Sequence, residues 1–337
     1  MKLDAALMEA DVAQSGMRGK GYEEAGFDGI QSFEGPHDPF LQLVLVAAET
    51  SRVELMTAIA IAFARNPMVC AYMANDLQLM SKGRFILGLG TQIKPHITRR
   101  FSQPWSKPNA RIHEFVRAVR AIWNCWSTGE RLAFTGEFYQ HTLMSPFFNP
   151  GANPFGLPKI FLAGFGNSMV RVAGEVADGW ITHPLTSRDF LLQESIPALE
   201  TGLQTAGRSR GDFEIACETI TMLGSNDEEI ARAREQAKTQ IAFYGSTPAY
   251  KVSLDHHGWG DLQPQLNRMT KEGKWAEMTT LITDDMLDTL GISGTPTQVA
   301  ARLVERHDFA DRVTMMLYNE TSPEAVTDIV RLVHAAN

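Results

Sequence analysis

The residues best suited to chemistry in this sequence stand in short polar loops, each directly after an apolar run. Glu34 and His37 form the first such group, with Asp38 beside them. A carboxylate and an imidazole three residues apart can hold and move a proton near neutral pH, because histidine titrates in that range. A second interpretation remains open. Asp38 before Pro39 is also typical of a helix N-cap, which would leave His37 as a surface residue.

The second group is a glycine-rich turn that leads straight into a segment with helical periodicity. Glycines let the backbone approach a ligand closely, and the first N–H groups of a helix bind anions, phosphate above all. An ordinary tight strand-to-helix turn would produce the same pattern. The residues expected to bind a phosphate are Gly164, Phe165, Gly166, Asn167 and Ser168.

The third group is the run Gly88-Leu89-Gly90-Thr91-Gln92 at the end of another apolar segment. Alternating glycines remove side chains where a flat ligand could lie, but they also fit a strand to a crowded barrel interior. His96 follows, with Arg99 and Arg100 close behind. This basic turn could meet an anionic group or be simply solvated.

Metal and nucleophile chemistry lack their usual residues. His256 and His257 are adjacent, so their side chains point to different sides, and no third ligand follows at a useful spacing. The three cysteines are widely spaced and include no CxxC pair. A P-loop, a GxSxG elbow and an HxH pair on the first strand are absent as well. We therefore expect no metal, and a bound redox cofactor that supplies the chemistry.

Eight apolar runs with strand character alternate with helical segments along the chain. The clearest helix begins at Pro108, and its apolar residues from Ile112 to Trp126 recur along one face. Residues 132–158 are rich in Pro, Gly, Asn and aromatic residues, which indicates a long loop with room for a hairpin. The predicted strands are Lys2–Met8, Phe27–Phe33, Val53–Ile61, Arg84–Gly90, Lys159–Ala163, Gly179–Thr182, Phe213–Leu223 and Val313–Tyr318.

This alternation predicts a single (β/α)8 TIM barrel domain over residues 1–337, with a mostly helical insertion at about 243–291 before the last strand. Working residues of such a barrel follow the carboxyl ends of its strands, where the three groups and Thr182-His183 all fall. A doubly wound sheet is the competing architecture. Its GxGxxG fingerprint fails twice, because Ile93 and Met169 occupy the third glycine position.

The composition bounds the class of protein. Of the 337 residues, 44% are hydrophobic and 21% are charged, so the chain can form a large core. A net charge of -8 argues against nucleic acid as a partner, since phosphate backbones attract basic surfaces. No apolar run approaches the roughly 20 residues of a membrane helix, and the N-terminus does not read as a secretory signal. We expect a cytoplasmic protein that acts on a small molecule.

At these residues the sequence resembles the luciferase-like monooxygenase superfamily, and within it the branch of oxidoreductases that depend on the deazaflavin coenzyme F420. The likeness covers nearly the whole chain, and its motifs are specific through their order and spacing. They are Glu23–Gly29, Thr57-Ala58-Ile59 with Arg65-Asn66-Pro67, Gly83–Gly90, Ala163–Gly166 and Ala173–Trp180.

The resemblance implies a cofactor ring at the mouth of the barrel. A non-prolyl cis peptide near Ala58 and Ile59 would press on that ring. Gly90, Thr91 and Gln92 would line it, while the turn at 164–168 would hold the cofactor phosphate. A homodimer is implied as well.

The implied cofactor is F420, with FMN as the alternative. F420 carries an anionic oligoglutamate tail that would seek cations such as Arg65, Arg99 or Arg100, close to His96. Sugar-phosphate dehydrogenases of this family have an Asp-His pair after strand two and a glutamate after the strand-four glycines. Here Glu34-Gly35 and Ile93 stand at these places, so oxidation of a sugar phosphate is not expected.

We therefore expect an F420-dependent oxidoreductase that exchanges a hydride with a small organic substrate. His37 is the candidate for the proton role, and Glu34 would lie near the ring or tune the histidine. Two alternatives keep the same fold: an FMN-dependent monooxygenase, and a flavin-binding protein without catalysis.

Overall fold

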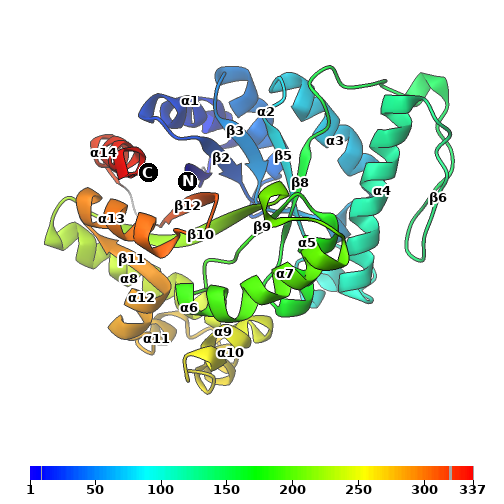
Figure 1. Cartoon of the computed structure of the whole chain (residues 1–337). Coiled ribbons are helices and arrows are strands. Elements are labelled where there is room, and N and C mark those ends of the chain that lie inside the picture. The colour runs from blue at the N-terminus through cyan, green and yellow to red at the C-terminus, as the bar shows by residue number, and fades with distance from the viewer. Residues whose placement is uncertain (9, 319–320, 337) are drawn as a thin grey trace.

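The computed structural model describes residues 1–8, 10–318 and 321–336. Eight parallel strands close into a barrel through the pairing of the last strand with the first, and helices surround it (Figure 1). This confirms the predicted (β/α)8 TIM barrel. The barrel strands are β1 (Lys2–Leu7), β2 (Gly29–Ser32), β3 (Glu54–Thr57), β5 (Phe85–Gly90), β8 (Lys159–Ala163), β9 (Gly179–Ile181), β10 (Glu214–Leu223) and β12 (Arg312–Leu317).

Helices follow the strands at the predicted places, and several begin where proline stands at the first helical position. In α4 (Pro108–Thr128) the predicted apolar stripe is buried from Ile112 to Trp126. The other helices of the outer layer are α1 (Ser15–Ala25), α2 (Pro39–Glu49), α3 (Pro67–Met80), α5 (Asn167–Val176), α6 (Arg188–Phe190), α7 (Ile196–Thr205), α8 (Asp227–Gly245), α13 (Pro296–Arg306) and α14 (Pro323–Ala336). No helix in this described part is both long and apolar enough to cross a membrane.

The third predicted strand is interrupted. Instead of one strand over 53–61, the structure has β3 and a short β4 (Ala60–Ile61), with a cis peptide between Ala58 and Ile59. The resemblance implied this bond at this place. Both β3 and β4 pair with β5, so the interruption stays within the barrel wall.

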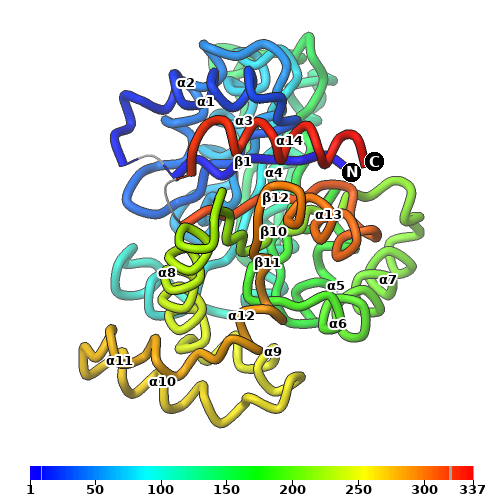
Figure 2. The backbone as a smooth tube through the Cα atoms, turned by 90° about the vertical axis from the view of Figure 1, so that its left-hand side faces the viewer, coloured from blue at the N-terminus to red at the C-terminus, as the bar shows by residue number. Residues whose placement is uncertain are grey.

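The insertion before the last strand is helical, as predicted, and forms a layer of its own at one end of the molecule (Figure 2). Its helices are α9 (Lys251–His256), α10 (Leu262–Lys271), α11 (Trp275–Thr279) and α12 (Asp284–Leu290). A short strand that was not predicted, β11 (Gly291–Gly294), then pairs with the carboxyl half of β10. Its four residues include two glycines, so no strand pattern marks it.

The region 132–158 contains the small hairpin for which the prediction left room. Its strands are β6 (Phe134–Thr135) and β7 (Gln140–His141), and they pair in antiparallel fashion. Glu114 of α4 accepts hydrogen bonds from the backbone N–H groups of Glu137, Phe138 and Tyr139 in the turn. The hairpin is thereby fastened to the outer helix layer.

A buried ion-pair group closes the amino end of the barrel. The Nε atom of Arg312 lies 2.8 Å from a carboxylate oxygen of Asp4, and its Nη2 lies 2.7 Å from Glu54. The side chains of Arg312 and Asp4 are 0% and 1% exposed. The carboxylates of Asp4 and Glu54 offset the positive charge of Arg312, and this pairing makes the burial of the guanidinium group tolerable. The group lies at the end of the barrel opposite to the candidate site and has a structural role.

Candidate functional site

The barrel interior is apolar below its mouth. Met56, Ile86, Phe161, Ile181 and Ala216 form a buried cluster there, and Ala58 belongs to it. Ile59 and Ala163 pack against this cluster from the carboxyl side and are only partly buried. The predicted cofactor residues Ala58 and Ile59 therefore form the floor of the mouth.

Glu34 is held by an arginine. Its carboxylate pairs with Arg65 and accepts a hydrogen bond of 2.8 Å from the backbone N–H of Ile61. Arg65 also lies 2.6 Å from Asp38, whose other oxygen caps α2 by accepting from Phe40 N–H. Burial lowers the pKa of Arg65, but the two carboxylates outweigh it and the net pKa is raised. Glu34 thus fixes the loop after β4.

These contacts change one expectation. Arg65 was a candidate cation for an anionic cofactor tail, but the structure commits it to Glu34 and Asp38. The N-cap interpretation of Asp38 is confirmed.

His37 lies at the edge of the mouth. Its Nε2 is 2.8 Å from the carbonyl oxygen of Ala10, in the loop after β1. A carbonyl only accepts, so Nε2 carries a proton in this contact. The ring therefore joins two loops, and a proton-transfer role for His37 stays a prediction.

The turn after β5 adjoins the floor of the mouth. A β-carbon on Gly90 would lie 2.8 Å from the side chain of Ile59, so this glycine permits the close contact. Thr91 and Gln92 follow, partly buried, and Gln92 has a positive φ of 58°. His96, Arg99 and Arg100 lie on the next turn, His96–Arg100, with exposed side chains.

The glycine-rich turn after β8 leads into α5 as predicted. Gly166 is the N-cap residue, and a β-carbon there would meet no atom within 4 Å. Asn167 and Ser168 open the helix, so their N–H groups have no partner within it. The side-chain amide of Asn167 donates to Glu194 at 3.4 Å, so it is already engaged. The backbone N–H groups of this turn are therefore the groups that can bind an anion.

An aromatic wall stands beside this turn, and the insertion supplies much of it. The ring of His183, just after β9, lies 4.1 Å from that of Tyr250 and 4.7 Å from that of Tyr244. Phe165 lies 4.7 Å from Tyr250 and 5.3 Å from His183, so its side chain belongs to the wall. Tyr244 comes from α8 and Tyr250 from the turn Pro248–Tyr250.

His183 is a neutral histidine with a defined tautomer. Burial lowers its pKa to about 3. The backbone N–H of Leu185 donates to Nδ1 at 3.1 Å, so the ring proton sits on Nε2. Because the side chain is partly exposed, it lines a recess and is not sealed in the core.

Glu218 is the acid of this recess. It lies in β10 two residues after Ala216, and alternation along a strand puts both on the inner face. Burial raises its pKa to about 8. When ionised, Glu218 raises the pKa of Tyr244, Tyr250 and Tyr318, so these three phenols lie within electrostatic range of it. The hydroxyl groups of Tyr244 and Tyr318 are 3.2 Å apart.

The sequence analysis missed four residues of this recess: Glu218, Tyr244, Tyr250 and Tyr318. The sequence did carry a signal for Glu218, because a charged residue in the middle of a predicted buried strand is unusual. No comparable sequence signal marks the three tyrosines. They come from segments whose meeting point depends on how the insertion folds.

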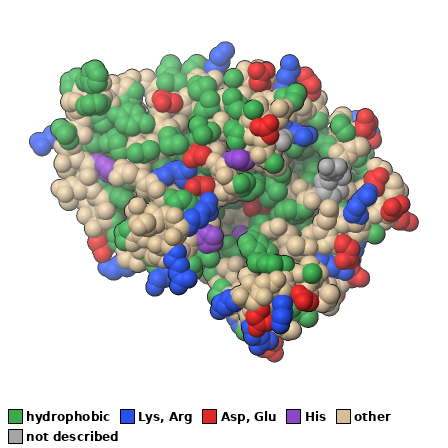
Figure 3. Space-filling model, turned by 180° about the vertical axis from the view of Figure 1, so that it is seen from behind, with side chains coloured by type: hydrophobic (Ala, Val, Ile, Leu, Met, Phe, Trp, Pro, Cys, Tyr) green, Lys and Arg blue, Asp and Glu red, His purple; other side chains and the backbone are tan. Residues whose placement is uncertain are grey.

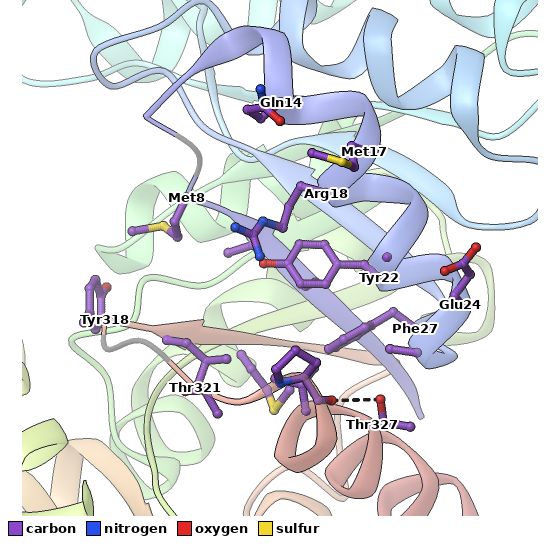
Figure 4. A pocket seen from close by; sticks show the side chains of 18 residues that line it. Met8, Gln14, Met17, Arg18, Tyr22, Glu24, Phe27, Tyr318, Thr321 and Thr327 are labelled. Atoms are coloured by element: carbon purple, nitrogen blue, oxygen red, sulfur yellow. Dashed lines mark hydrogen bonds between the residues drawn. The ribbon is translucent and has the colours of Figure 1, made fainter.

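The molecule has further hollows. Figure 3 shows a hollow near the middle of one face, with histidine side chains beside it. A groove of about 1180 Å3 runs between α1 and α14, and Met17, Tyr22 and Tyr318 are among its lining residues (Figure 4). Within residues 1–8, 10–318 and 321–336 there is no group of three His, Cys, Asp or Glu side chains that could hold a metal ion.

Comparison with known proteins finds relatives that cover most of this chain. An uncharacterized protein of Mycobacterium tuberculosis is 47% identical over 97% of this chain and 96% of its own. The 5,10-methylenetetrahydromethanopterin reductase of Archaeoglobus fulgidus is 28% identical over 84% of this chain and 82% of its own. The structure of the coenzyme F420-dependent tetrahydromethanopterin reductase of Methanopyrus kandleri matches with a TM-score of 0.82 at 19% identity, covering 99% of both chains.

The family assignment follows from a match that spans most of the molecule. The sequence pattern described as luciferase-like monooxygenase fits residues 8–312, from the end of β1 to the start of β12. It therefore includes the interrupted third strand, both glycine turns and the helical insertion. This chain belongs to the luciferase-like monooxygenase family.

Proposed function

We propose that this protein is an oxidoreductase that binds coenzyme F420 and exchanges a hydride between it and a small organic substrate. One observation carries the proposal. The strands β4, β5 and β8 are neighbours in the barrel. They bring the surface formed by Ile59 and Gly90 next to the amino end of α5, whose first N–H groups have no partner within the helix. A flat ring and a phosphate joined by a short chain need these two features side by side.

The residues present fit such a cofactor. Ala58, Ile59 and Gly90 would lie beneath the ring, with Thr91 and Gln92 at its edge. The N–H groups of Asn167 and Ser168 would hold the phosphate, since Gly166 leaves the approach open. When bound, the deazaflavin would supply a hydride to the substrate or accept one from it. The chain's own residues would orient the substrate, exclude water and handle the accompanying proton.

The sequence relatives support a reductase. The 5,10-methylenetetrahydromethanopterin reductase of Archaeoglobus fulgidus covers most of this chain. The exposed side chains of Arg99 and Arg100 on the turn after β5 are suited to an anionic tail, with His96 beside them. With Arg65 engaged elsewhere, they are the cations we expect to contact it.

The competing proposal is an FMN-dependent monooxygenase, which the family's description makes the natural rival. FMN lacks the oligoglutamate tail, so Arg99 and Arg100 would have no anionic group of the cofactor to contact. A binding protein without catalysis is the third possibility. Such a protein would bind the cofactor, but the acid Glu218 and the tyrosines of the recess would then take no part in a reaction.

Two assays, one without oxygen and one in air, separate the three proposals. Purified protein is mixed with reduced F420 and a panel of aldehydes, ketones and imines, and the visible absorbance of the oxidised coenzyme is followed. The same protein is mixed with reduced FMN in air, and oxygen consumption is measured. Substrate-dependent oxidation of F420 is expected. Substrate-dependent oxygen uptake with FMN alone would move the protein to the monooxygenases, and binding without turnover would make it a carrier.

A further inference from the structure

Glu218, the acid of the recess, lies outside the residues that would hold the cofactor. We propose that Glu218 exchanges the proton with the reacting oxygen or nitrogen of the substrate, that Tyr244 and Tyr318 connect it to solvent, and that the substrate presents an uncharged carbonyl or imine there. This inference rests on the proposed function and specifies its proton donor and its substrate class.

Glu218 faces the barrel interior from β10, at the level where the neighbouring strand β9 ends. Its backbone N–H donates to Thr182 Oγ1 at 3.2 Å, which ties it to the end of β9. The side chain is only partly buried, so the carboxyl group is open to a molecule in the recess. A substrate lying against the floor at Ile59 would meet it from the opposite wall.

The surroundings of Glu218 carry little charge. The titratable groups within its electrostatic range are Tyr244 from α8, Tyr250 from the turn before α9 and Tyr318, which follows β12. Among the described residues none of the groups acting on these four is an arginine or lysine. Burial alone therefore keeps the pKa of Glu218 near 8, and the group is protonated at neutral pH.

The same surroundings select the substrate. A carboxylate or phosphate would enter an uncharged, hydrogen-bonding recess without a counterion, which costs desolvation free energy that nothing offsets. An uncharged carbonyl or imine can instead accept a hydrogen bond from a protonated acid or a phenol. His183 strengthens this selection, because its ring is neutral and its proton is on Nε2.

Two tyrosine hydroxyl groups offer a path for the proton. The 3.2 Å contact between the hydroxyl groups of Tyr244 and Tyr318 links α8 to the end of β12. Tyr318 also lines the groove between α1 and α14 (Figure 4). Burial raises the pKa of both phenols, so they would pass a proton along while remaining neutral.

The step balances with reduced deazaflavin as the two-electron donor. A hydride forms the new C–H bond at the substrate carbon, and the π pair of the C=O or C=N bond moves to the heteroatom. Glu218 gives its proton to that heteroatom and becomes a carboxylate. It regains a proton from solvent through Tyr244 and Tyr318. In the oxidative direction the carboxylate accepts the proton instead.

The first test uses the protein without cofactor. Infrared difference spectra are recorded across pH 5–10 for the wild type, for Glu218→Gln and for the control Glu200→Gln, an exposed acid on α7. A protonated-carboxyl band that disappears near pH 8 in the wild type and the control, but is absent from Glu218→Gln, is expected. A wild type that shows no such band between pH 6 and pH 8 would overturn the proposal.

The second test separates this inference from the proposed function. F420 binding is measured first on the wild type and Glu218→Gln, and comparable affinities are expected. The variant should then reduce carbonyl substrates at least roughly 10²-fold more slowly and lose the fall in rate above pH 8. Tyr318→Phe should slow turnover without moving the infrared band. Equal affinity with an unchanged rate would overturn the role of Glu218, whereas a wild type that fails to bind F420 would overturn the proposed function itself.

Discussion

The carbonyl oxygen of Thr57 lies 1.7 Å from the point where a β-carbon on Gly88 would stand. The Thr57 hydroxyl donates to the Gly88 carbonyl at 2.7 Å and accepts from its N–H at 2.9 Å. The interrupted third strand therefore presses on β5 where only glycine fits. Of the two interpretations of the Gly88–Gly90 run, close packing within the barrel accounts for Gly88, and Gly90 is the one that faces the floor of the mouth.

Replacing Gly88 should destabilise the barrel. Gly88→Ala forces the Thr57 backbone to move, and overpacking of this kind costs about 1–3 kcal/mol in the free energy of unfolding. Urea denaturation followed by circular dichroism measures the loss. Gly21→Ala is the matched control, because a β-carbon there meets nothing within 4 Å in the middle of α1. If both variants were equally stable, the close packing at Gly88 would not constrain the strand.

Gly166 should matter for the cofactor and little for the fold. Its φ of -84° suits any residue and its surroundings are empty, so Gly166→Val should keep nearly the wild-type stability. The branched side chain would cover the first N–H groups of α5. We expect F420 to bind at least about tenfold more weakly, as measured by fluorescence titration. Unchanged affinity would remove this turn from the site.

The raised pKa of Glu218 should appear in the pH dependence of stability. The folded protein keeps this proton up to about pH 8, whereas the unfolded chain loses it near 4.5. Since the folded state binds more protons in between, the free energy of unfolding falls as pH rises from about 4.5 to about 8. Glu218→Gln removes this loss, so the variant should gain stability over the wild type with increasing pH. Thermal denaturation at a series of pH values checks this, and parallel curves would contradict it.

The ion pair at the amino end of the barrel should be costly to break from one side. Arg312→Met leaves Asp4 buried without its cation, and loss of one partner of such a pair costs about 3–5 kcal/mol. Asp4→Leu added to this variant should restore part of the loss, because the orphaned charge is then gone. Urea denaturation of the single and double variants measures both. A double variant no more stable than Arg312→Met would show that the orphaned Asp4 carboxyl group does not cause the loss.

Much of the fold could be predicted because each barrel strand is an apolar run between polar turns. The strand Lys159–Ala163 matches its predicted bounds, and the clearest predicted helix begins at Pro108 as expected. The errors lie where tertiary contacts overrule the local pattern. The run 53–61 is apolar except for Glu54 and Thr57 and was predicted as one strand, yet the structure divides it at Ala58 and Ile59.

The candidate site could also be predicted only in part, because some of its residues have local sequence signals and others do not. Glu34, His37 and the glycine turns are local signals, and the structure brings them to one end of the barrel. Their partners are not local. Arg65 meets Glu34 from 31 positions away, and Tyr318 meets Tyr244 from 74. Which side chains complete the recess is decided by how the insertion folds over the mouth, and no spacing along the chain encodes that.

The most direct test of the account is equilibrium binding of F420 and FMN to the protein without cofactor, measured side by side by fluorescence. A deazaflavin that lacks the oligoglutamate tail is included to isolate the contribution of Arg99 and Arg100. We predict that F420 binds more tightly than FMN and that loss of the tail weakens binding, increasingly so at low salt. Tighter binding of FMN than of F420 would contradict the account, and so would a protein that binds neither compound.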